Sequence, residues 1–256
     1  SCSLSMQRHE CVREAKSMVS LSNPIEDVRD GTLADAAYDR LRQDIITGER
    51  APGERLRIER LKGIYAIGPT PLREAMQRLS QDGLVTAQGN RGFTVAPLDP
   101  AEFADLNIAR TAVEKEALRL SIANGGTEWE AGIVAAAYIL KKEDGALESA
   151  DGRVPDSWER ANAEFHAALV SACGSNWLLR IRSGLQDLCE RYLRAAINRG
   201  HGARNLQAEH ASILEAALQR DTNRACQLLE EHFVRTAATL SGGQEDEPTE
   251  AQFRSA

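Results

Sequence analysis

The stretch TPLREAMQRLSQDGLV occupies residues 70–85 and has the spacing of a short amphipathic helix. Thr70 can cap this helix with Pro71 at its first position, and Asp82-Gly83 is typical of a helix end. The apolar side chains recur at intervals of three and four residues, so they share one face and leave the polar side chains on the other. These apolar residues are Leu72, Ala75, Met76 and Leu79.

Two helical patterns come before this stretch, and two short β-like runs follow it. Residues 33–46, with Thr32 as a cap, and residues 58–65 have helical spacing. Residues 84–87 and 92–96 are strand-like and are separated by a short polar loop. The order helix, helix, turn, helix, hairpin predicts a winged helix-turn-helix with a small β-hairpin wing.

A recognition helix presents polar and cationic side chains to base edges and phosphates, and packs its rear face on the other helices. Thr70, Arg73 and Arg78 are the side chains predicted to face DNA. At the tip of the wing, glycine allows close approach to the minor groove and an arginine suits its negative potential. Arg91 and Gly92 are therefore also predicted DNA contacts, the alternative for Arg91 being a solvated charge.

Beyond residue 100 every sustained pattern is helical, which predicts an antiparallel all-α bundle. The fold class is therefore mainly α, with a β-hairpin wing in the first domain. We expect a flexible arm at 1–31, a DNA-binding domain at 32–96, a linker at 97–100, the bundle at 101–241 and a disordered tail at 242–256. The predicted bundle helices cover 101–123, 127–143, 156–173, 176–198, 205–219 and 222–240.

The composition is that of a globular protein, with 42% hydrophobic and 27% charged residues. It contains no apolar run long enough for a membrane span and no signal-peptide pattern, so a cytoplasmic protein without membrane contact is expected. The five cysteines form no CxxC pair and predict reduced thiols. The net charge of −7 is uneven: residues 31–96 carry +2 and residues 97–256 carry −8, which favours a DNA contact by the first domain.

Residues 71–79 and 82–85 resemble the TPxREAL…L…GLV signature of the GntR superfamily. The resemblance implies a winged helix-turn-helix that binds double-stranded operator DNA. It also implies that Arg57, at the start of the second helix, contacts the DNA backbone; a role without DNA contact is an equal alternative. Pro69 stands where the family commonly has an arginine, which predicts a different operator sequence.

The second half resembles the FCD ligand-binding domain of the FadR-like branch, through residues 108–114, residues 162–166 and the pairs Glu209-His210 and Glu231-His232. Many members of that branch hold a divalent metal beside a small carboxylate effector. By resemblance, the ligands in this chain are Asn162, His166, His210 and His232. Zinc is the first expectation, with nickel or manganese as alternatives.

The spacing supports a shared site independently. Asn162 and His166 are four residues apart and lie on one helix face, while His210 and His232 each sit among apolar neighbours. Buried imidazoles need a proton, a metal or a hydrogen-bond network. Asn162 departs from the usual aspartate and offers only a neutral oxygen, so weaker metal binding or an empty site is expected.

Arg110 is the predicted anchor for the effector carboxylate, because a guanidinium can hold a carboxylate through two hydrogen bonds. The alternative is an exposed pair with Glu114, four residues further along the helix. Asn162 is a second predicted effector contact. Further candidates for the same pocket are Arg191, Tyr192 and Asn205.

A narrower resemblance, to carbon-starvation-induced repressors of glutarate and γ-aminobutyrate catabolism, is carried by short runs. They include residues 56–58, 71–75 and 128–131. This resemblance implies a short dicarboxylate such as glutarate as the effector.

These observations together predict a homodimeric repressor on an inverted-repeat operator, because a two-fold protein binds a two-fold site. Effector binding is expected to release the DNA. One alternative is a metal-dependent enzyme acting on a carboxylate, in which Glu164 is the only evident base. Another is an architectural DNA-binding protein whose sensor domain is vestigial.

Overall fold

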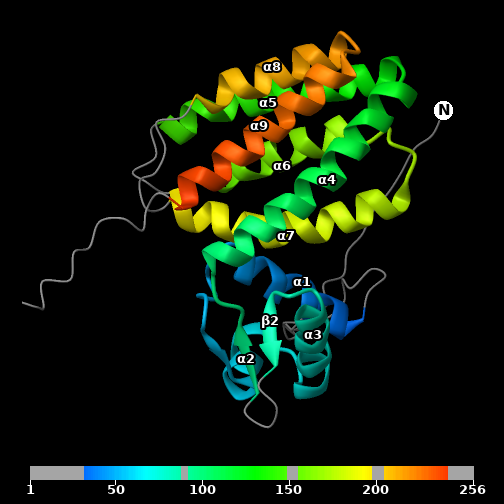
Figure 1. The fold of residues 1–256 in the computed structure, drawn as a ribbon. Helices are drawn as coiled ribbons and strands as arrows, with labels where there is room; N and C mark the ends of the chain where they lie inside the picture. The colour runs from blue at the N-terminus through cyan, green and yellow to red at the C-terminus, as the bar shows by residue number, and fades with distance from the viewer. Residues whose placement is uncertain (1–31, 88–91, 149–154, 198–204, 242–256) are drawn as a thin grey trace, which may run out of the picture.

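The computed structural model describes residues 32–87, 92–148, 155–197 and 205–241. The expected N-terminal arm, the C-terminal tail and the predicted wing contact Arg91 lie outside these residues. The described chain forms a small head with three helices and a larger helical bundle, which lies above the head in Figure 1.

The head has the predicted winged helix-turn-helix order. Its helices pack around a dense core in which the largest side chains are fully buried, each such burial stabilising the fold by about 1.5–3 kcal/mol. The core side chains include Leu41, Leu61, Leu72, Met76, Leu79 and Leu84. The elements are α1 (Leu33–Ile46), β1 (Arg55–Leu56), α2 (Ile58–Tyr65), α3 (Pro69–Gln81), β2 (Val85–Ala87) and β3 (Phe93–Val95).

The two predicted helix caps of the head have different outcomes. Thr32 caps α1 as expected, in a capping box with Asp35. The prediction that Thr70 caps the recognition helix is wrong, because α3 already begins at Pro69 with Gly68 as its cap. Proline suits the first helical position, where its missing N–H leaves no hydrogen bond unmade. Thr70 therefore lies inside the first turn, where its side chain is exposed.

The predicted pair of wing strands, β2 and β3, is confirmed, and β1 adds a third strand to the sheet. The strand order is β1-β3-β2, and both pairings are antiparallel, with Leu56 opposite Phe93 and Val85 opposite Val95. β1 has only two residues, too few to show the alternation by which a strand is found in a sequence. Through its pairing with β3, β1 connects the turn before α2 to the wing.

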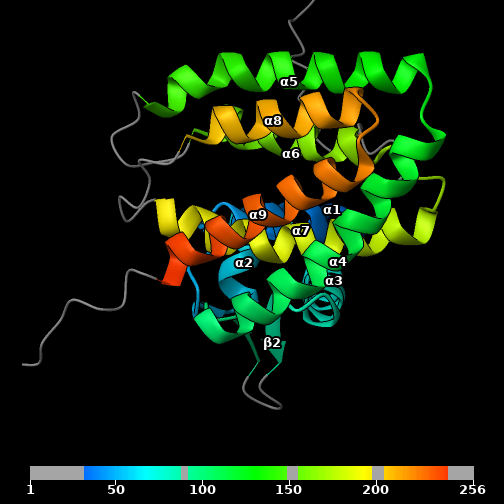
Figure 2. The same cartoon turned by 45° about the horizontal axis from the view of Figure 1, so that its top comes forward.

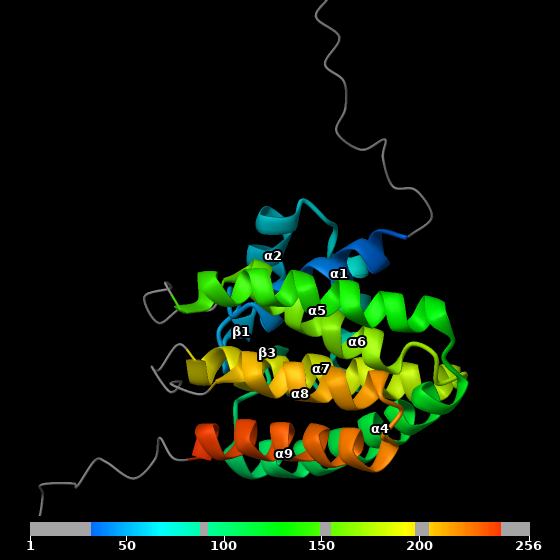
Figure 3. The same ribbon diagram turned by 90° about the horizontal axis from the view of Figure 1, so that it is seen from above.

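The C-terminal domain is a bundle of helices without a strand among its described residues, as predicted. α4 packs on both α7 and α9, and α5 packs on α6 (Figures 2 and 3). None of the described helices combines the length and apolar character of a bilayer-crossing helix. The helices are α4 (Pro100–Asn124), α5 (Thr127–Glu148), α6 (Asp156–Val170), α7 (Asn176–Ile197), α8 (Leu206–Leu218) and α9 (Thr222–Ser241).

α7 is the bundle helix that lies against the head (Figure 1). Asp187 accepts two hydrogen bonds from Arg42 of α1, the one from Nε measuring 2.7 Å, and Leu188 packs on the head's apolar core. Arg191 donates to the carbonyl oxygen of Ala96, at the end of the wing. Polar and apolar contacts of α7 therefore fix the head to the bundle.

A partly buried cluster of carboxyl groups around Arg194 joins α6 to α7. Arg194 lies 2.8 Å from Asp156, 3.2 Å from Glu159 and 3.1 Å from Glu190, so one guanidinium serves three carboxyl groups. Burial and the neighbouring charge of Glu190 raise the pKa of Glu159 to about 9. Glu159 therefore holds a proton at neutral pH in the folded chain.

Glu159→Gln is expected to make stability less dependent on pH. Because the folded pKa of Glu159 lies above the ordinary 4.5, the folded state loses stability as pH rises from about 4.5 towards 9. Glutamine resembles the protonated form and removes that loss. We expect a small difference at pH 5, close to the ordinary pKa, and a gain of several kcal/mol at pH 8, measured by urea unfolding.

The matched control is Glu164→Gln, at an exposed position on the same helix. It should give no pH-dependent difference. An equal effect of Glu159→Gln at both pH values would contradict the assignment of the proton to Glu159.

Candidate functional site

The exposed face of α3 carries the side chains available to DNA. Thr70, Arg73 and Gln77 are exposed on it, and the opposite face is buried in the head core. Arg73 and Gln77 are one turn apart and share a face. Gln77 was missed by sequence reasoning, which considered mainly cations; its amide is suited to an adenine edge.

Arg78 has a different position from the one predicted. Its Nη1 donates to Asp35 of α1 at 2.6 Å, and its guanidinium lies 4.3 Å from the centre of the Tyr38 ring. The backbone N–H of Thr32 and the Arg78 guanidinium lower the pKa of Asp35 to about 2. Arg78 thus joins α3 to α1, and we leave it out of the DNA-facing set.

The other predicted DNA contacts lie beside α3. Arg57 is exposed at the start of α2, and Gly92 is exposed at the start of the last wing strand. The φ of Gly92 is 95°, in the region that favours glycine. A side chain at this position would strain the backbone, so the wing depends on glycine here.

Three histidines from three helices meet in the bundle interior. His166 of α6, His210 of α8 and His232 of α9 are all buried, and one potential ligand atom from each lies within 4.8 Å of the others. The ring centres are separated by 5.4 Å, 5.1 Å and 4.8 Å. The structure therefore brings together the three imidazoles that the resemblance assigned to one metal.

The protonation of the cluster suits metal binding. Burial, followed by the charges of the neighbouring His232 and His210, lowers the pKa of His166 well below its usual value. A neutral imidazole keeps a lone pair for a metal. His232 contacts Glu209 through Nδ1 at 2.9 Å, an arrangement that orients metal-ligating histidines.

Two polar atoms beside the cluster lack a hydrogen-bond partner in the described part of the chain. They are Nδ1 of His166 and Oδ1 of Asn162, one turn earlier on α6. Buried polar atoms are almost always satisfied, so a missing partner requires an explanation. A divalent cation is such a partner for nitrogen and oxygen ligands, and these residues fit one.

Arg110 was predicted either to anchor an effector inside the bundle or to form an exposed pair with Glu114. The structure shows a buried arginine that also lies near Glu114. It is only 3% exposed, so it points into the bundle, yet its Nε lies 3.7 Å from Glu114 Oε1. Its guanidinium also lies 4.0 Å from the centre of the Phe233 ring, and Phe233 neighbours two of the histidines. Arg110 therefore joins the histidine cluster as a buried cation.

Sequence reasoning missed two further members of this interior, Arg182 and Gln186 of α7. Each is 8% exposed, and Arg182 Nε donates to Glu114 Oε2 at 2.9 Å. In the sequence they resemble the polar positions of any amphipathic helix. Their spacing of four residues shows that they share a face, but not that the face is buried.

The other residues predicted to contact the effector form hydrogen bonds to other parts of the protein. Arg191 bonds the wing end, and the Tyr192 hydroxyl bonds Glu102 at 2.7 Å and the backbone N–H of Asp99 at 3.2 Å. Asn205 is exposed and caps α8. None of these described contacts involves a histidine: Arg191 joins the bundle to the wing, Tyr192 joins α7 to the start of α4, and Asn205 begins a helix. The structure therefore does not bring these three residues to the histidine cluster, and their effector role stays a prediction.

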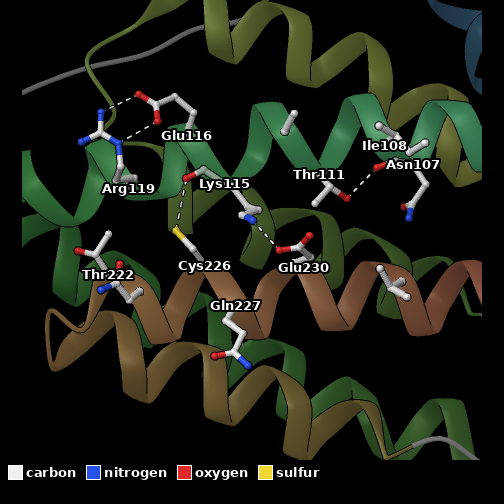
Figure 4. Close-up of a pocket in the computed structure, with 13 residues that line it drawn as sticks. Asn107, Ile108, Thr111, Lys115, Glu116, Arg119, Thr222, Cys226, Gln227 and Glu230 are labelled. Atoms are coloured by element: carbon white, nitrogen blue, oxygen red, sulfur yellow. Dashed lines mark hydrogen bonds and ion pairs between the residues drawn. The ribbon is translucent and has the colours of Figure 1, made fainter.

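A groove of about 700 Å³ lies on the outer side of α4 and α9 (Figure 4). Lys115 crosses it to Glu230 at 2.5 Å, and Arg119 pairs with Glu116. Its charged side chains are thus already neutralised by one another. None of the three histidines lines this groove, so it is separate from the histidine cluster.

The fold and the exposed face of α3 define a DNA-binding regulator of the winged helix-turn-helix class. The chain matches the gntR family of bacterial regulatory proteins over residues 33–95 and the FCD domain over residues 105–235. The chain therefore belongs to the GntR family and carries an FCD domain.

Curated relatives agree with this assignment. The chain is 41% identical to the HTH-type transcriptional regulator BphR of Paraburkholderia xenovorans (strain LB400), over 85% of this chain and 88% of that protein. It is 37% identical to the HTH-type transcriptional repressor GlaR of Escherichia coli (strain K12), over 77% of this chain and 90% of that protein. These relatives are transcriptional regulators, so the chain is a regulator and not the metal-dependent enzyme considered as an alternative.

A solved structure has the same fold. A GntR transcriptional regulator from Rhodococcus sp. RHA1 is 24% identical and superposes with a TM-score of 0.67 over 82% of this chain and 97% of that chain. The likeness extends through both domains.

Proposed function

We propose that the chain is a homodimeric repressor whose heads bind an inverted-repeat operator and release it when a small carboxylate binds the bundle. The observation that carries the sensor part of this proposal is the buried cluster His166, His210 and His232 with Arg110 beside it. The repressor role is supported by the similarity to the transcriptional repressor GlaR, which extends over 77% of the chain.

In this proposal the three histidines and Asn162 hold a divalent cation, zinc first, with nickel or manganese as alternatives. Such an ion supplies positive charge and an open coordination position to a carboxylate. Arg110 provides a guanidinium in the same interior, where its burial strengthens its attraction for an anion. Because Asn162 is neutral, the charge of the ion is not offset by this ligand.

The effector proposed is a short dicarboxylate, with glutarate as the first compound to test. The resemblance in short runs of sequence supports it. Independently, the two buried arginines, Arg110 and Arg182, face a single buried glutamate, Glu114. A positive interior of this kind favours an anionic ligand.

For the acid to release DNA, it must bind more tightly to the arrangement of heads that is not bound to DNA. α7 is suited to carry this change, because Arg182 and Gln186 face the interior while Asp187 contacts α1 of the head. A change at the interior face of α7 therefore acts on the helix that holds the head.

The proposed binding to an inverted-repeat operator is tested by selecting, from a pool of random DNA duplexes, those that bind the purified chain. We expect an inverted repeat with half-sites about 10 base pairs, or a multiple of that, apart, bound by two chains. Footprinting and sedimentation of the complex measure both properties. Selection of unrelated sequences would instead favour the architectural alternative with a vestigial sensor.

A further inference from the structure

The inner face of α7 carries polar groups that the histidine cluster does not use. Arg182 and Gln186 lie one turn apart and are each 8% exposed. In the described part of the chain, Nη2 of Arg182 and Oε1 of Gln186 have no hydrogen-bond partner. Leaving a buried polar atom unsatisfied is unfavourable, so these atoms mark a position where a ligand can bind.

Glu114 lies between two guanidinium groups. Its Oε2 accepts from Arg182 Nε at 2.9 Å, and its Oε1 lies 3.7 Å from Arg110 Nε. One carboxylate and two guanidinium groups give this trio of described residues a net charge of +1. A buried charge of this kind is stable only when an anion pairs with it.

The two arginines contact different oxygens of Glu114. Arg110 stacks at 4.0 Å on Phe233, whose ring centre is 5.6 Å from that of His166, so it belongs to the histidine side. Arg182 comes from α7, and its neighbour at one turn is Gln186. A ligand that binds Arg110 on the histidine side and Arg182 on α7 without displacing Glu114 therefore needs an acidic group for each arginine.

We propose that Arg182 and Gln186 form a second anchor, which binds the distal carboxylate of a two-ended acid whose first carboxylate lies beside the histidines and Arg110. This proposal rests on the proposed carboxylate-sensing function and names the residues that select for a second acidic group. Arg182 donates through Nη2, and the Gln186 amide can turn its Nε2 donor towards the same carboxylate.

The contrasting explanation is that Arg182 is only the structural partner of Glu114. Removing Arg182 alone would leave Glu114 buried and unpaired, which destabilises proteins strongly. The double variant Glu114→Gln/Arg182→Gln avoids this outcome. It removes one positive and one negative charge, so the net charge of the group with Arg110 is unchanged.

The probes are glutarate and pentanoate, which have the same number of carbon atoms and differ by one carboxylate. Titration calorimetry of the zinc-loaded full chain should show that glutarate binds more tightly than pentanoate. In the double variant we expect glutarate affinity to fall about 10- to 100-fold, with pentanoate affinity unchanged. Gln186→Met should lower glutarate affinity by about 3- to 10-fold and serves as a milder second variant.

The control is Arg119→Gln, whose side chain is 51% exposed on the outer side of α4. It should leave both affinities unchanged, and zinc content should be equal in all variants. Equal loss of both acids, or no loss of glutarate in either variant, would overturn the second anchor. Failure of the unmodified chain to bind either acid would overturn the carboxylate-sensing function and this anchor with it.

Discussion

Replacing Arg73 with alanine is expected to lower operator affinity at least about 30-fold. Arg73 is exposed in the first turns of α3, the part of a recognition helix that meets base edges. A bidentate arginine contact to guanine contributes about 1–3 kcal/mol, and a two-fold dimer loses it at both half-sites. Fluorescence anisotropy with the selected operator, at a fixed salt concentration, measures the change.

The control for Arg73→Ala is Arg224→Ala, which removes an exposed arginine from α9 in the bundle. Both variants lose one positive charge per chain, so the comparison separates a contact of α3 from a general effect of charge. Equal weakening by the two variants would contradict the assignment of the α3 face to DNA.

The second large effect is expected at His166. His166→Ala removes one of three imidazoles and should lower zinc affinity at least about 100-fold, because loss of a residue that merely orients a ligand already lowers affinity 10- to 100-fold. Competition with a chromogenic chelator measures the affinity. Glu209→Gln, which alters the group that contacts His232, should give the smaller effect of an orienting residue.

Unfolding in the presence of chelator separates metal binding from packing. His166 is buried against Phe233, so alanine leaves a cavity and should lower the stability of the metal-free chain by about 2–4 kcal/mol whether or not the cluster binds a metal. That loss combined with unchanged zinc affinity would mean that the cluster is structural.

Much of the head could be predicted from the sequence, because local patterns determine it. Helical spacing and flanking Gly and Pro residues placed α1, α2 and α3 within a few residues. The errors have physical causes. β1 is too short to show a period, and Pro69 rather than Thr70 begins α3. Arg78 pairs with α1, a tertiary contact that no local pattern indicates.

The bundle was predicted as a class of fold, and its histidines were found through their apolar neighbours and the resemblance to a family. The buried positions of Arg182 and Gln186 could not be predicted in that way. Whether a polar residue on an amphipathic helix is exposed depends on which other helix covers it. In this chain α4 packs on that face of α7 and brings Glu114 to Arg182.

The central claim, that the histidine interior controls the head, is tested most directly by adding glutarate to the zinc-loaded complex of the chain with its selected operator. The account predicts that glutarate releases the DNA from the unmodified chain. The same addition should have no effect on the complex formed by His166→Ala. Glutarate that leaves DNA binding unchanged in the unmodified chain, or releases DNA equally from both proteins, would contradict it.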